Sequence, residues 1–391
     1  MTHTLTPSSD TSMDDLDGLA RVLTADGERV PEPLLDRYLD DVDGGMLRDL
    51  YRQMAVLRRI DAEGVALQRQ GQLGLWAPCR GQEATQIGTA SAFAVTDQLL
   101  PSCRETGVLL VRGADPASFV RQWRGDAHSR GARAGRGRDL HLGPAQIIIG
   151  AQTLHAVGYA MGIQRDEALS RVPAGAGEVA ACYFGDGATS QGDVNEAMIF
   201  AASYGAPVVF ICSNNHYAIS EPVGLQAPFP IVGRAPGFGI PSLRVDGNDV
   251  LACLAAARWA AEHAREGSGP AFIEAVTYRM GPHTTADDPT RYRSDDEVAC
   301  WAARDPLARV EAQLRDMDAW SDDFARDVAR ACDDQAAAVR AACLEMEPGD
   351  PMRVFDHVYA EPHTGLARQR AAYGAYLADF ADATVAAAVE Q

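Results

Sequence analysis

Two short polar clusters in the middle of the sequence combine residue types that could bind a metal and a phosphate. The first, Gly185-Asp186-Gly187-Ala188, follows the apolar run VAACYF, and the second, Asn214-Asn215, comes shortly after the apolar run PVVFIC. Carboxylate and amide oxygens are hard ligands that suit an octahedral Mg²⁺ completed by phosphate oxygens. Glycines beside Asp186 would let the backbone approach a phosphate closely. These residues therefore predict a site for a metal-bridged diphosphate.

The segment between the two clusters predicts how they meet. Residues 193–205, DVNEAMIFAASYG, place apolar residues at helical spacing between the two strand-like runs. A helical crossover makes the flanking strands parallel, so Asp186 and Asn215 should lie at one edge of a sheet. Open α/β sheets bind ligands outside this edge, and the helix that begins near Asp193 would add N–H donors.

Simpler interpretations of each cluster remain open. Gly-Asp-Gly alone is typical of a turn, and Asn-Asn alone is typical of a helix cap or loop, so only their joint placement favours a ligand site. Residues 175–180, GAGEVA, match the dinucleotide pattern G-x-G-x-x-A weakly, because this segment precedes its strand. A P-loop is excluded, since no G-x-x-x-x-G-K-[ST] motif occurs.

The wider pattern predicts an α/β doubly wound fold, with a mostly parallel sheet flanked by helices. A long helix opens the folded body at residues 46–70. Strand-like and alanine-rich helical runs then alternate at 82–93, 108–111, 151–160, 179–184, 193–204, 208–212, 251–265 and 272–276.

The ends of the chain differ from this body. Residues 1–44 are polar and acidic, which predicts an extended arm that needs a partner for order. We expect one domain over 45–365 and a helical tail over 366–391, after a charged, helical stretch that begins at residue 295. The Gly/Arg-rich segment 124–143 is long for a loop in a compact domain, so it is either functional or a solvated surface.

Composition excludes several classes of protein. The formal charge of the 391 residues is 35 − 54 = −19, and no continuous basic face is visible, which argues against nucleic acid as a partner. The eight cysteines form no C-x-x-C pair, which favours a reducing cytoplasm. Neither a signal-like start nor a run of 18 apolar residues occurs, so we expect neither export nor a membrane span.

The sequence also resembles a known family. Gly-Asp-Gly, the 26 residues 188–213 and Asn-Asn followed by HYAIS are similar to the thiamine diphosphate motif of alpha subunits of 2-oxo acid dehydrogenase decarboxylase components. The resemblance extends in order over roughly residues 45–365. It includes RGQEA (80–84), GAQTLHAVG (150–158), VDGNDV (245–250), YRMGPHTTADDPTRYRSDDEV (278–298) and FDHVYAE (355–361).

The resemblance implies a role for individual residues. It implies Mg²⁺ ligation by Asp186, by the Asn215 side chain and by the Tyr217 carbonyl group. His283 matches the active-site histidine of a mobile loop, which would also contact the cofactor, and an ordinary imidazole pKa near neutrality would suit a proton donor. The further cofactor contacts that the resemblance implies are Arg104 and Arg279 to the diphosphate, the backbones of Ile147 and Ile149 to the aminopyrimidine, and Gly185, Gly187 and Ala188.

Two of these assignments have plainer alternatives. Arg279 could be an exposed arginine at a strand end, and the isoleucine side chains alone are typical of a core. The family commonly has tyrosine where this chain has Cys103, which removes one contact to the cofactor.

The resemblance implies oxidative decarboxylation of a 2-oxo acid and transfer of the acyl group to a lipoyl group. Branched-chain substrates are favoured by the residues around His283, with pyruvate as the alternative. No glutamate in the motifs can be placed to activate the cofactor. The resemblance implies that a beta subunit supplies it, in an α₂β₂ assembly that serves a lipoyl acyltransferase. An NAD-dependent dehydrogenase and a non-catalytic family member are the other hypotheses.

Overall fold

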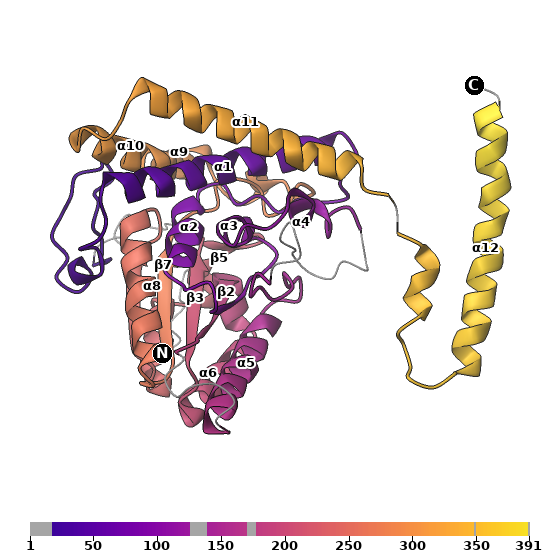
Figure 1. The fold of residues 1–391 in the computed structure, drawn as a ribbon, viewed down its shortest axis with the longest axis horizontal. Coiled ribbons are helices and arrows are strands. Elements are labelled where there is room, and N and C mark those ends of the chain that lie inside the picture. Colours follow the sequence, from indigo (N-terminus) through magenta and orange to yellow (C-terminus); the bar gives the residue numbers. More distant parts are fainter. Residues whose placement is uncertain (1–17, 126–138, 170–176, 348, 390–391) are drawn as a thin grey trace, which may run out of the picture.

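A parallel sheet lies at the centre of the computed structural model, which describes residues 18–125, 139–169, 177–347 and 349–389 (Figure 1). Within these residues every pair of neighbouring strands in the main sheet is parallel. The strands, in spatial order, are β1 Gln98–Leu100, β2 Ala180–Gly185, β3 Val208–Asn214, β7 Ala271–Val276 and β6 Ser242–Asp246.

Helices cover both faces of this sheet, which confirms the predicted α/β doubly wound fold. Alternate strand residues enter two separate cores. Tyr183 and Ile211 pack with helices α1 (Gly44–Arg69), α2 (Glu83–Ser91) and α8 (Val250–Arg265). Phe184 and Phe210 pack with α5 (Ala151–Ala168) and α6 (Gly192–Tyr204) on the other face. Because both faces are covered, the central strands β2 and β3 are runs of mainly apolar residues rather than alternating polar and apolar ones.

The predicted βαβ unit is confirmed by β2, α6 and β3. The two strands pair in parallel, with Gly185 opposite Ser213. Helix α6 begins at Gly192 and ends at Tyr204, and the following Gly205, with a positive φ of 58°, caps it. Strands β1 and β6 were not predicted. The remaining short elements are α3 Thr106–Val111, α4 Pro116–Val120, β4 Tyr217–Ala218, β5 Glu221–Pro222, α7 Val223–Gln226 and the 3₁₀ helices η2 Asp36–Tyr38, η4 Asp186–Ser190, η5 Ile231–Phe238 and η6 Pro289–Arg291.

The N-terminal arm is ordered by its own chain over residues 18–43, which corrects the expectation that it needs a partner. The buried carboxylate of Asp249 accepts hydrogen bonds from the backbone N–H groups of Val22 (2.7 Å) and Leu23 (2.6 Å). Ala20 also bridges to Val245 on β6. Three expectations fall on residues outside the described ranges, namely the start of the arm (1–17), most of the Gly/Arg-rich loop (126–138) and the first residues of the weak dinucleotide match.

The C-terminal third is helical, as predicted. Helices α9 (Asp295–Ala302), α10 (Pro306–Asp316) and α11 (Asp322–Leu344) follow β7, and α11 lies along α1. Beyond η7 (Pro351–Phe355), helix α12 (Thr364–Val389) stands apart from the body (Figure 1). Among the described helices, none is both long and apolar enough to cross a bilayer.

Asp249 should carry much of the stability of the arm. Its second oxygen accepts from the N–H groups of Leu251 and Ala252 at the start of α8, so Asp249→Ala would leave four backbone donors without this partner. We expect the free energy of unfolding to fall by roughly 3–5 kcal/mol in urea titrations. The control Asp43→Ala removes one exposed cap, from Met46 N–H, and should cost about 1 kcal/mol. Equal losses for the two variants would contradict this role.

Candidate functional site

Asp186 lies at the carboxyl edge of the sheet, as the first residue of η4 directly after β2. Its side chain is only 1% exposed. One carboxylate oxygen, Oδ1, accepts a hydrogen bond from the backbone N–H of Asn215 at 3.3 Å. The other, Oδ2, is buried and has no hydrogen-bond partner. The structure therefore brings the two polar clusters together, as predicted.

Burial of this carboxylate has an electrostatic consequence. Loss of solvation raises the pKa of Asp186 to about 6, although the N–H of Asn215 and the charges of Arg279 and Arg104 act in the opposite direction. An ionised carboxylate oxygen that is buried without a partner needs a proton or a cation. A hard divalent cation fits this group, because the turn that contacts Asp186 through Asn215 offers amide and carbonyl oxygens.

The turn after β3 supplies those further oxygens. Oδ1 of Asn215 accepts from the backbone N–H of Tyr217 at 3.4 Å, and the Tyr217 carbonyl accepts from Arg279 Nη1 at 2.8 Å. His216 turns the chain with a φ of 71°. A side chain at Gly187 would place its Cβ 2.6 Å from the Cβ of Ala218, so the packing of this turn requires glycine there.

Two buried arginines flank the carboxylate edge. Arg279 is fully buried and Arg104 is 7% exposed, which excludes the alternative of an exposed strand-end arginine. Arg279 donates to the carbonyls of Tyr217 and Ile219, and its Nε has no hydrogen-bond partner. Burial, and next the charge of Arg104, lower the pKa of Arg279. Within the described ranges neither guanidinium is ion-paired with a carboxylate, so this pair has the charge that a diphosphate requires.

His283 contacts Arg104 but does not titrate near neutrality. Arg104 Nη2 lies 3.1 Å from His283 Nδ1 and donates to the His283 carbonyl at 2.8 Å. Burial lowers the pKa of His283 to about 3, with further lowering by Arg104 and Arg279, so the expected value near 7 is wrong for this geometry. Because a guanidinium can only donate, Nδ1 must accept, and the proton of the neutral ring therefore sits on Nε2.

The loop that carries His283 is held by residues to which the sequence interpretation gave no role. Asp287 accepts from the backbone N–H of His283 at 2.7 Å. Arg293 Nη2 donates to the carbonyls of Met280 and Gly281 at 2.8 and 2.9 Å. Tyr292 joins Asp287 to Arg279 through its hydroxyl group. In the sequence these residues stand in the segment DDPTRYR (287–293), which begins with Asp287 and ends with Arg293.

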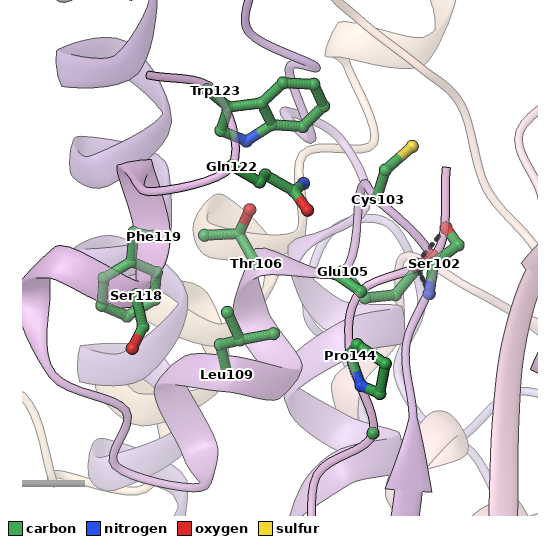
Figure 2. A pocket seen from close by; sticks show the side chains of 12 residues that line it. Ser102, Cys103, Glu105, Thr106, Leu109, Ser118, Phe119, Gln122, Trp123 and Pro144 are labelled. Carbon is green, nitrogen blue, oxygen red and sulfur yellow. Dashed lines mark hydrogen bonds between the residues drawn. The ribbon is translucent and has the colours of Figure 1, made fainter. Parts of the chain in front are cut away.

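A cavity of about 190 Å³ is lined by Cys103 and Glu105, the residues on either side of Arg104 in the sequence (Figure 2). Residues of the 102–109 segment face residues of α4 and its following turn across it. Burial raises the pKa of the Cys103 thiol, so it is protonated at pH 7. The lining includes Cys103, Thr106, Leu109, Phe119, Trp123 and Pro144.

Ile147 and Ile149 lie on the segment that precedes α5, and their side chains are 61% and 46% exposed. The alternative that they belong to the core is therefore wrong. Ile148 between them is 70% exposed, so three adjacent isoleucines form an apolar surface. Such a surface is characteristic of a contact with another molecule.

Known proteins resemble this chain over most of its length. The family model described as "Dehydrogenase E1 component" matches residues 51–345. The 3-methyl-2-oxobutanoate dehydrogenase subunit alpha of Mycobacterium tuberculosis is 47% identical over 343 residues, which cover 88% of this chain and 90% of the relative. The pyruvate dehydrogenase E1 component subunit alpha of Staphylococcus epidermidis is 37% identical over 361 residues, which cover 91% of this chain and 92% of the relative.

The pKa of Asp186 predicts a specific dependence of stability on pH. With a value of about 6 in the folded chain and 3.8 as the ordinary value, the folded state binds more protons between these limits. Ionisation of Asp186 therefore lowers the free energy of unfolding as pH rises from about 4 to 6. Asp186→Asn, which cannot ionise, should match the unliganded wild type near pH 4. At pH 7 it should be more stable by up to about 3 kcal/mol.

Urea unfolding of both proteins at each pH measures this difference, and other titrating groups cancel in it. A difference that stays constant between pH 4 and pH 7 would show that Asp186 is not buried as a charged group.

Proposed function

Because the chain belongs to the dehydrogenase E1 component family, we propose that it is the alpha subunit of a branched-chain 2-oxo acid dehydrogenase. This oxidoreductase would decarboxylate the 2-oxo acid and pass the acyl group to a lipoyl group of an acyltransferase. The choice of substrate class rests on the higher identity to the 3-methyl-2-oxobutanoate enzyme, 47% against 37% for the pyruvate enzyme. Pyruvate remains the second candidate.

Enzymes of this family depend on thiamine diphosphate, which supplies the electron sink for decarboxylation. We assign Asp186, the Asn215 side chain and the Tyr217 carbonyl to Mg²⁺, and Arg104 and Arg279 to the diphosphate. The observation that carries this assignment is the unpartnered Oδ2 of Asp186 beside two buried arginines that make no ion pair in the described structure. The backbones of Ile147 and Ile149 would face the aminopyrimidine, and those of Gly185, Gly187 and Ala188 the diphosphate.

His283 would donate a proton from Nε2 to the acyl acceptor. Arg104 occupies Nδ1, so the neutral ring presents its Nε2 hydrogen as a hydrogen-bond donor. Full proton transfer requires the imidazolium form, because a neutral ring that lost this proton would become an imidazolate. A bound diphosphate would also offset the two arginine charges that lower the pKa of His283.

A beta subunit completes the site in this proposal, as part of an α₂β₂ assembly in the cytoplasm. Support comes from the exposed isoleucines 147–149 beside the site and from the exposed aromatic side chains of Tyr159 on α5 and Phe200 on α6. The partner would supply the activating glutamate. All eight cysteines are unpaired, which agrees with a reducing compartment.

Two other functions are less well supported. A dinucleotide-dependent dehydrogenase would need a glycine fingerprint after a strand, whereas Gly177 comes before β2. A non-catalytic family member is motivated by Cys103 alone, and the remaining proposed ligands are all present.

Turnover by the assembled enzyme tests the proposed function. The chain mixed with its beta subunit, thiamine diphosphate and Mg²⁺ should release CO₂ from a panel of 2-oxo acids, with the highest kcat/KM for 3-methyl-2-oxobutanoate. The chain alone should be inactive. A higher kcat/KM for pyruvate would reverse the substrate assignment, and activity of the isolated chain would contradict the two-subunit site.

Substitution of His283 separates the two half-reactions. General acid catalysis contributes about 10²–10⁴-fold, so His283→Ala should lower lipoyl acylation by that factor, whereas decarboxylation with an artificial electron acceptor should fall less. Asp287→Ala is the control, because it releases the backbone of the same loop and keeps the imidazole. It should lower both rates together. Equal losses for His283→Ala would mean that His283 only orders the loop.

A further inference from the structure

Glu274 is a buried carboxylate under the candidate site. It lies in the middle of β7, between β3 and β6, opposite Cys212 and Arg244. Its side chain is 0% exposed. Alternation along the strand places it on the same face as Phe272, which belongs to the core under α5 and α6. A carboxylate at such a position is costly unless its oxygens are used.

One oxygen of Glu274 holds the turn that carries the proposed metal ligands. Oε1 accepts from Asn214 Nδ2 at 2.7 Å. Because this contact fixes the amide orientation, Oδ1 of Asn214 faces the turn and accepts from the backbone N–H of His216 at 3.2 Å. His216 is the residue with positive φ between Asn215 and Tyr217. We call these two successive hydrogen bonds, from Asn214 to Glu274 and from His216 to Asn214, the relay. The relay therefore connects Glu274 to the turn whose oxygens are assigned to the metal.

The other oxygen of Glu274 holds a second segment. Oε2 accepts from the backbone N–H of Val232 in η5 at 2.8 Å, and Arg244 Nε lies 3.5 Å from it. Two residues on, Arg234 donates to the carbonyl of Thr189 in η4. Thr189 in turn donates through Oγ1 to the carbonyl of Asp186 at 2.7 Å. The Asn215 turn and the η4 segment with Asp186, which hold the proposed metal ligands, are thus both connected to Glu274.

We propose that Glu274 is a positioning residue that sets the Asn215 turn against Asp186 through the side chain of Asn214. It touches neither metal nor substrate. The inference rests on the proposed function, since it assumes that Asp186, Asn215 and Tyr217 bind Mg²⁺. Supporting hydrogen bonds of this kind change metal affinity by about 10–100-fold when they are removed.

Magnesium titration of the assembled α/β enzyme at saturating thiamine diphosphate tests this role, because it measures affinity and not turnover. Asn214→Ala removes the relay and leaves the contact of Glu274 to Val232. Glu274→Leu removes both contacts at similar volume. Each variant should raise the apparent Kd for Mg²⁺ by about 10–100-fold. The double variant should be no worse than the weaker-binding single variant, because the two residues act in series.

Asp97→Asn is the matched control. Asp97 is also fully buried and ion-paired, with Arg265 at 2.8 Å, but it binds Val179 N–H before β2, at the opposite end of the sheet from the site. It should lower the melting temperature and leave the Kd for Mg²⁺ within about twofold, since it contacts no proposed ligand. Melting curves of all variants report whether they fold. If Glu274→Leu does not fold, the Kd for Mg²⁺ of Asn214→Ala alone tests the positioning role.

The outcomes separate the inference from the proposed function. If the wild-type assembly binds Mg²⁺ and the folded Asn214→Ala variant binds it with the same Kd, the positioning role alone is overturned. A wild-type assembly whose thiamine diphosphate binding does not depend on Mg²⁺ would overturn both. A loss in Asp97→Asn equal to that in Asn214→Ala would show that general destabilisation, not positioning, lowers the affinity.

Discussion

The burial of an unpartnered carboxylate at the end of a parallel strand is the constraint on which the site depends. Asp186 loses its solvation, and this loss outweighs its hydrogen bonds to the backbone, so its pKa rises to about 6. Arg279 and Arg104 act on it through their charges but do not contact it. Oδ2 of Asp186 and Nε of Arg279 are buried without a hydrogen-bond partner, which is costly for charged groups. A divalent cation bound to a diphosphate would satisfy both, with the metal at the carboxylate and the phosphates at the guanidinium groups.

The sheet topology explains why these groups meet. Strands β2, β3 and β7 are neighbours and parallel, so the residues that follow them, Asp186, Asn215 and Arg279, emerge at one edge. The same topology places Glu274 one strand away from the Asn215 turn. The strands therefore position the proposed ligands. The His283 loop lies outside the sheet and is held instead by its hydrogen bonds with Asp287 and Arg293.

Local patterns in the sequence were sufficient to predict the βαβ unit at the centre of the fold. They were not sufficient to predict the edge strands β1 and β6 or the order of the N-terminal arm. The runs around Asp186 and Asn215 are long, apolar and separated by a periodic helix, so the βαβ unit could be predicted. Strand β1 has only three residues, and β6 has four of its five residues only partly buried, so neither carries a clear pattern. The order of the arm depends on Asp249, which bonds to residues 226 and 227 positions away, and no local rule detects such a contact.

The same limit applies to the site. Residue types and spacing pointed to Asp186 and Asn215, because their chemistry is intrinsic to the side chains, whereas Arg104 and Arg279 were assigned through the resemblance to the family. The low pKa of His283 depends on burial between two cations, and the role of Glu274 depends on which side chain faces it across the sheet. Both are properties of the assembled structure.

Binding of thiamine diphosphate to the α/β assembly, with and without Mg²⁺, tests the central claim most directly. Calorimetric titration should give a tight complex in Mg²⁺ and little binding in a chelator, whereas thiamine, which lacks the diphosphate, should gain nothing from the metal. Equal affinity for thiamine diphosphate with Mg²⁺ and with chelator would contradict a metal-bridged diphosphate at Asp186.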